Sequence, residues 1–178
     1  MTSTFAPFYL FLDFDGVLHD RRASDDDLFI YADRLGLLLE HYPEVVVVVS
    51  SSAGKTHLLA ALQAACGSSL GPRLKDVTPI VKRVLDGIPA FQRFKEIAYW
   101  LATHPAPTDD GRDPGVDALA RHDWIALDDA AQGFSPACSQ LIHVVDGLGL
   151  TISHFTEIEA RVAGHRRCCV VPRIFDEN

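Results

Sequence analysis

Two aspartates separated by one residue, Asp13 and Asp15, follow an apolar stretch in the sequence FYLFLDFDGVL. The apolar residues predict a buried strand over 8–14, and Asp15-Gly16 is typical of a turn. Two carboxylates held this close repel each other, and burial next to an apolar strand makes the repulsion worse. A divalent cation would neutralise them. The pair therefore indicates a cation site, and the alternative interpretation is an ordinary acidic turn.

Further polar residues follow the other stretches that have strand character. Val45 to Val49 is β-branched throughout, which is typical of a central parallel strand covered on both faces. Shorter strands are expected at 124–127 and 141–145, and strands that alternate with helices indicate a doubly wound parallel sheet. Ligands of such sheets lie at the carboxyl ends of the strands. The polar residues at these ends, which together predict a magnesium and phosphate site, are Asp13, Asp15, Ser50, Ser51, Asp128, Asp129 and, as a weaker candidate, Asp146.

The sequence VVVVVSSSAGKT offers a rival interpretation, because its last three residues resemble the end of a phosphate-binding P-loop. Such a loop needs a glycine five positions before Gly54, and Val49 stands there. Valine resists the positive φ that a tight wrap around phosphates requires. The stretch WIALDD could serve as a Walker B strand, but a P-loop nucleotide kinase leaves the Asp13/Asp15 pair without a role. Gly54 to Thr56 is more simply the start of a helix.

The remaining pattern indicates an α/β protein of one domain over 1–178, with its core at about 8–165. Cysteine spacing shows neither CxxC nor a zinc-ligand pattern, so we expect reduced thiols and a cytoplasmic protein. The longest strongly apolar run is far too short to span a bilayer, and a net charge of -8 argues against a broad nucleic-acid surface. We expect helices at 28–41, 55–66, 91–103 and 153–163, short strands at 76–81 and 168–171, and a surface loop at 104–116.

The stretch DFDGVL, residues 13 to 18, resembles the first motif of the haloacid dehalogenase (HAD) superfamily. The later sequences VVVVVSS, QRFKEIAYWL and WIALDD follow in the order of the superfamily's other motifs. The resemblance covers roughly residues 8 to 165, and it is strongest to small HAD domains that occur alone or in RNA-repair multidomain proteins. Their second motif usually continues with Trp-Arg, whereas this chain has Ala53-Gly54-Lys55. The resemblance implies a three-layer α/β/α Rossmann-like fold with a mostly parallel sheet.

The resemblance also implies a phosphoryl-transfer mechanism. Asp13 would attack the phosphorus and form an aspartyl-phosphate. Mg²⁺ would bridge Asp13 and a phosphoryl oxygen, with the main-chain carbonyl of Asp15 also facing the metal. The Asp15 side chain would protonate the leaving oxygen and later deprotonate the attacking water. The presence of this second aspartate favours phosphate esters, because halide ions leave without a proton.

The other motifs imply the rest of the site. Ser50 would donate a hydrogen bond to the phosphoryl oxygens, and Ser51 would replace it if the strand ended one residue later. Arg93 would clamp the phosphoryl group, with Lys95 and Lys55 as alternatives. Asp128 would complete the metal shell, and Asp129 would be a second ligand through water or an orienting group. His19 would either contact the substrate or, as the preferred interpretation, lie in an exposed loop.

These roles predict a Mg²⁺-dependent phosphatase. The segments between Asp15 and Ser50 and between Ser51 and Arg93 are too short for a large cap domain. An open site would accept a bulky phosphomonoester, such as a polynucleotide end or a phosphorylated protein side chain. The alternative is a non-catalytic HAD-like binding or regulatory module. Neither the physiological substrate nor the oligomeric state follows from the sequence.

Overall fold

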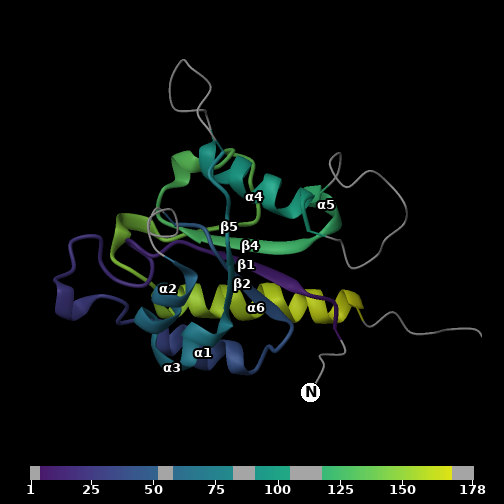
Figure 1. The fold of residues 1–178 in the computed structure, drawn as a ribbon. Coiled ribbons are helices and arrows are strands. Elements are labelled where there is room, and N and C mark those ends of the chain that lie inside the picture. Colours follow the sequence, from purple (N-terminus) through teal and green to yellow (C-terminus); the bar gives the residue numbers. More distant parts are fainter. Residues whose placement is uncertain (1–4, 52–57, 82–90, 105–117, 170–178) are drawn as a thin grey trace, which may run out of the picture.

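A computed structural model describes residues 5–51, 58–81, 91–104 and 118–169. A five-stranded sheet crosses the molecule (Figure 1), and every pair of neighbouring strands is parallel. The order of the strands is β3-β2-β1-β4-β5, so β1 lies at the centre. The bounds of the strands are β1 Phe8–Leu12, β2 Val45–Val49, β3 Leu74–Val77, β4 Asp123–Asp128 and β5 Leu141–His143.

Helices cover both faces of the sheet, which makes the fold a three-layer α/β/α arrangement (Figure 1). Side chains along β1 alternate between two cores: Phe8, Leu10 and Leu12 pack against α1 and α6, whereas Tyr9 and Phe11 pack against α4. The bounds of the helices are α1 Ala32–Glu40, α2 Leu59–Ala65, α3 Gly67–Leu70, α4 Gln92–Ala102, α5 Ala118–Arg121 and α6 Ile152–Cys169. Short 3₁₀ helices are η1 Asp25–Asp27, η3 Gly71–Arg73, η4 Ala131–Gly133 and η5 Val145–Gly147.

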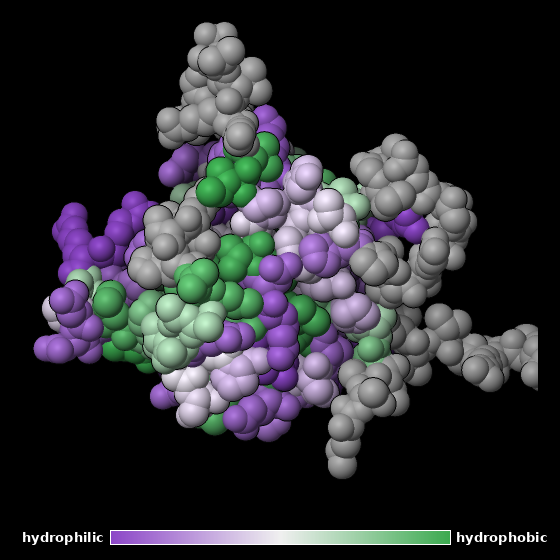
Figure 2. All heavy atoms as spheres, in the orientation of Figure 1, coloured by the Kyte–Doolittle hydropathy of each residue, from purple (hydrophilic) through white to green (hydrophobic). Residues whose placement is uncertain are grey.

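The outer surface is mixed, with hydrophilic residues placed between groups of hydrophobic ones on the face that Figure 2 shows. None of the helices in the described part of the chain is long and apolar enough to cross a membrane. Between Asp15 and Ser50 the chain forms only η1, α1 and β2, so no cap domain is inserted there. From Asp13 to Tyr31, the described chain that follows the central strand β1 contains only loops and η1.

The helix expected at 28–41 begins later, because α1 starts at Ala32. Phe29 has a φ of 61°, a left-handed conformation that interrupts a right-handed helix. The three aspartates Asp25–Asp27, which precede Phe29, form the separate helix η1. A single strained residue thus separates the loop after β1 from the helix that follows.

Two further boundaries were wrong. The strand expected at 76–81 is β3, Leu74–Val77, and it ends before Pro79, which has no N–H to donate to a neighbouring strand. The strand expected at 168–171 does not form at Cys168 and Cys169, because α6 continues to Cys169. Arg166 holds this last part of α6 by bonding the carboxylate of Glu44. The expected loop at 104–116 lies outside the described residues from 105 onward, as does Lys55.

Candidate functional site

The carboxyl ends of three adjacent strands bring the polar residues together. Asp13 follows β1, Ser50 and Ser51 follow β2, and Asp128 ends β4. Because β1 lies between β2 and β4, the three ends meet at one edge of the sheet. Backbone hydrogen bonds extend this register past the strands, from Asp13 N to Leu127 O at 3.0 Å and from Ser50 N to Leu12 O at 2.8 Å.

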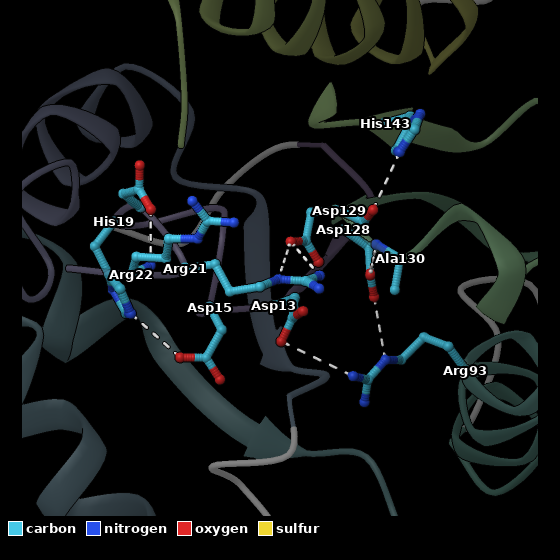
Figure 3. Close-up of polar contacts among 11 residues, drawn as sticks. Asp13, Asp15, His19, Arg21, Arg22, Arg93, Asp128, Asp129, Ala130 and His143 are labelled. Carbon is cyan, nitrogen blue, oxygen red and sulfur yellow. Dashed lines mark hydrogen bonds and ion pairs between the residues drawn. The ribbon is translucent and has the colours of Figure 1, made fainter. Parts of the chain in front are cut away.

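Three aspartates form a carboxylate cluster at this edge: Asp13, Asp128 and Asp129 each offer an oxygen, and these oxygens lie within 4.8 Å of one another. Asp13 and Asp128 are only 5% and 1% exposed. Asp15 lies beside them in Figure 3 but is exposed, and its carboxylate is outside the cluster. In the part of the chain that the structure describes, this is the group of three or more His, Cys, Asp or Glu side chains whose oxygens lie close enough together to hold one metal ion.

Burial changes the acidity of this cluster. Desolvation raises the pKa of Asp13, while Arg93 and a hydrogen bond from the Ser51 hydroxyl partly oppose the rise. Desolvation, followed by the charge of Asp13, raises the pKa of Asp128 to about 7. Without a metal ion, ionisation of Asp13 and Asp128 therefore lowers the stability of the folded protein.

Arg93, at the start of α4, is a cation that reaches the Asp13 and Asp128 members of the cluster (Figure 3). Its Nε donates to Asp128 Oδ2 at 3.1 Å, and its Nη2 lies 3.9 Å from Asp13 Oδ1. On its other side Nη1 lies 3.6 Å from Oε2 of the fully buried Glu96. Lys95, two residues further along the same helix, is exposed. Of the two candidate cations on α4, Arg93 is the one with the geometry to meet a phosphoryl group beside Asp13.

The two serines after β2 have different surroundings. Both are buried, at 2% exposure for Ser50 and 1% for Ser51. The Ser51 hydroxyl bonds to Asp13, whereas the Ser50 Oγ has no hydrogen-bond partner among the described residues. A buried hydroxyl that lacks a partner costs free energy unless a ligand satisfies it. Ser51 is thus the hydrogen-bond partner of the Asp13 carboxylate, whereas the Ser50 hydroxyl is available to a ligand.

His19 is buried at 3% exposure, so its expected place in an exposed loop was wrong. The Phe29 N–H donates to His19 Nδ1 at 3.3 Å, which leaves the proton of a neutral imidazole on Nε2. That nitrogen lies 3.2 Å from Asp15 Oδ1 and donates to it. The strained backbone of Phe29 thereby fixes the tautomer of the histidine that orients Asp15.

Arg21 and Glu96 were not predicted as site residues. Arg21 Nε donates to Asp129 Oδ2 at 2.9 Å, and Arg21 also lines a pocket of about 450 Å³ with Asp13, Asp15, Arg93, Asp129 and Ala130. Nothing in the local sequence separates Arg21 from the neighbouring loop charges. The side chain of Asp146 lies outside the described residues, so its weaker candidacy stays a prediction.

The donor set suits a divalent cation such as Mg²⁺. All candidate ligand atoms in the cluster are carboxylate oxygens, which hard cations prefer. The raised pKa values of Asp13 and Asp128 indicate that the negative charge is not fully compensated by the protein alone. Asp13, Asp128 and Asp129 therefore fit a resident cation in both chemistry and electrostatics.

The uncompensated charge predicts an unusual pH dependence of stability in chelator-treated protein. The folded-state pKa of Asp128 is about 7 against an ordinary value of 3.8, so between these pH values the folded state binds more protons than the unfolded state. Stability should therefore fall as pH rises through this window, by a few kcal/mol, since one pKa unit corresponds to about 1.4 kcal/mol. Urea unfolding of wild type and of Asp128→Asn at several pH values isolates the effect. The free energy of unfolding should fall less with rising pH in the variant than in wild type. An equal fall in both proteins would contradict the prediction.

Comparison with known families adds one finding. The family model described as the HAD domain in Swiss Army Knife RNA repair proteins matches residues 9–155, which include every member of the carboxylate cluster. No curated protein and no solved structure matches the chain.

Proposed function

Because the chain belongs to the family of HAD domains in Swiss Army Knife RNA repair proteins, we propose that it is a Mg²⁺-dependent phosphatase that acts through an aspartyl-phosphate. One observation carries this proposal: a buried aspartate, Asp13, shares a cluster with two other carboxylates and lies within reach of the Arg93 guanidinium. Asp13 thus has a guanidinium that can bind a phosphoryl group on one side, and two carboxylates that can bind a metal ion on the other.

The first half of the reaction forms the covalent intermediate. A carboxylate oxygen of Asp13 attacks the substrate phosphorus, the new O–P bond forms, and the bond from phosphorus to the leaving oxygen breaks. Asp15 gives its proton to that leaving oxygen. Its exposed carboxyl group, held by His19, lies at the rim of the same pocket and so meets the leaving group rather than the metal ligands.

The second half regenerates the enzyme. Asp15, now ionised, takes a proton from water, whose oxygen attacks phosphorus and displaces Asp13 as inorganic phosphate leaves. Arg93 stabilises the charge on the phosphoryl oxygens in both halves, because its guanidinium is fixed between Asp13 and Asp128.

Asp13, Asp128 and Asp129 would hold the Mg²⁺ ion. When bound, the ion neutralises the repulsion between the attacking carboxylate and the anionic phosphate. The protein's own part is to keep three carboxylates together despite the cost of burying them, and Arg93 and Ser51 lower that cost at Asp13.

We propose a bulky phosphomonoester as the substrate, with a phosphorylated polynucleotide end as the leading candidate. Two observations support this choice. The segment from Asp15 to Ser50 forms no cap, and the side chain of Asp15 is 57% exposed, so a large leaving group can approach. The family that matches the chain is described as a domain of RNA repair proteins, which favours a nucleic-acid substrate.

The test is phosphate release from 5′- and 3′-phosphorylated oligonucleotides and from p-nitrophenyl phosphate, in Mg²⁺ and in chelator. We expect metal-dependent release, with at least about tenfold higher kcat/KM for an oligonucleotide, because contacts remote from the phosphate contribute binding energy to the reaction. Equal kcat/KM for all substrates would contradict the polynucleotide assignment. Binding of Mg²⁺ without release from any substrate would favour a non-catalytic module instead.

A further inference from the structure

The carboxylate of Asp129 is almost fully enclosed by neighbouring loops, although Asp129 lies just beyond the end of a strand. Its side chain is 3% exposed although it follows β4 at the rim of the pocket. Three groups surround its Oδ2 atom: the backbones of Gly16 and Gly147 and the guanidinium of Arg21. These groups come from the loop after β1 and the loop after β5, so two loops close around one oxygen.

The two glycines create the space for this oxygen. A Cβ at Gly16 would lie 2.0 Å from Asp129 Oδ2, and one at Gly147 would lie 2.8 Å from it. Both glycines have positive φ, 74° and 62°, which other residues rarely adopt. The loops thus form a slot that only glycine permits, and the slot fits one carboxylate oxygen.

Arg21 closes the open side of the slot. Its backbone N–H donates to the Gly147 carbonyl at 2.9 Å, which ties the loop after β1 to the loop after β5. Its Nε and Nη2 both donate to the same oxygen, Asp129 Oδ2 (Figure 3). The guanidinium therefore leaves Oδ1, the other carboxylate oxygen, without a bond from Arg21.

We propose that Arg21 is a positioning residue for the metal site: it fixes Asp129 through Oδ2 so that Oδ1 serves the cation held with Asp13 and Asp128. The inference rests on the proposed metal site. It goes beyond that site by naming the residue that orients one of its ligands. Partners that hydrogen-bond a metal-ligating carboxylate typically contribute about 10- to 100-fold to metal affinity.

Removal of Arg21 can change the affinity for Mg²⁺ in either direction, and the direction shows which role the arginine has. Arg21 is a cation next to the cluster, and if it merely competed with the metal for Asp129, its removal would tighten metal binding. Positioning predicts the reverse, because an untethered Asp129 loses part of its entropy only when the metal binds. The sign of the change in metal affinity therefore separates the two roles.

Isothermal titration calorimetry with Mg²⁺ tests the proposal without any substrate. We expect Arg21→Ala to raise the Kd by about 10- to 100-fold, Arg21→Lys to restore part of the affinity, and Arg22→Ala, the exposed neighbouring arginine, to leave the Kd within about twofold of wild type. In an Asp129→Asn background, Arg21→Ala should cause no further loss, because the arginine acts through that carboxylate.

Each other outcome is decisive. Unchanged or tighter Mg²⁺ binding by Arg21→Ala, or an equal loss in the Asp129→Asn background, overturns the positioning role while the metal site stands. Absence of Mg²⁺ binding by wild type overturns both proposals. Circular dichroism and unfolding of each variant separate loss of affinity from loss of fold, and Arg21→Gln replaces any variant that does not fold.

Discussion

Asp13→Asn is expected to lower Mg²⁺-dependent phosphate release by at least about 10³-fold, since it removes the nucleophile from a mechanism that depends on covalent catalysis. Asparagine has nearly the same shape as aspartate and can keep the hydrogen bond from Ser51. The loss should therefore come from the chemical step rather than from unfolding. Removal of a negative charge from a cluster in which burial raises the pKa of Asp13 should leave the metal-free protein at least as stable as wild type.

Initial rates of phosphate release, together with urea unfolding, measure both expectations. Asp33→Asn is the matched control, because Asp33 is an exposed aspartate on α1 and makes no part of the carboxylate cluster. It should retain wild-type activity. If Asp13→Asn kept more than about a tenth of the wild-type rate, a nucleophile that accounts for most of the catalysis would be excluded.

Arg93→Ala is expected to lower kcat by about 10²- to 10³-fold, which is the usual effect of removing one fixed donor that stabilises transition-state charge. The same change removes the partner of a carboxylate that is 1% exposed, because Arg93 Nε bonds Asp128 Oδ2. The pKa of Asp128 should rise further in consequence, and the metal-free protein should become less stable at neutral pH.

Lys95→Ala is the control for this prediction, because Lys95 lies on the same helix with an exposed side chain. Its activity should stay within about twofold of wild type. Arg93→Lys should recover only part of the rate, since an ammonium group cannot reproduce the planar fork of a guanidinium. A large loss in Lys95→Ala with little change in Arg93→Ala would transfer the phosphate-binding role to the lysine.

The sequence predicted that Asp13 and Asp128 lie at the same edge of the sheet, because parallel strands end at a common edge. That β1 and β4 are neighbours, so that the two carboxylates meet, came from the structure. The run at 8–12 was recognisable as a strand by its apolar residues, and the run at 45–49 by its five β-branched valines. Ser50 and Ser51 were placed at the correct strand end for the same reason. What the sequence left open was the direction of each hydroxyl, which depends on how the chain turns after Val49.

Residues in the loop after β1 could not be assigned in the same way. His19 is buried because Phe29 takes a left-handed conformation and packs its ring against the imidazole, with 5.3 Å between the two ring centroids. Arg21 reaches Asp129 because its backbone bonds Gly147, far away in the sequence. Neither contact has a periodic or local signal. Both result from tertiary packing, which also moved the start of α1 to Ala32 against the helical pattern of the preceding residues.

The central claim is that a cation gathers the carboxylate cluster around Asp13 as the nucleophile. A crystal structure with Mg²⁺ and beryllium fluoride, a mimic of the phosphoryl group on aspartate, tests it most directly and needs no substrate. We expect beryllofluoride bonded to a carboxylate oxygen of Asp13, with Mg²⁺ coordinated by Asp13 and Asp128. An unmodified Asp13, with Mg²⁺ absent from the cluster or bound elsewhere, would contradict it.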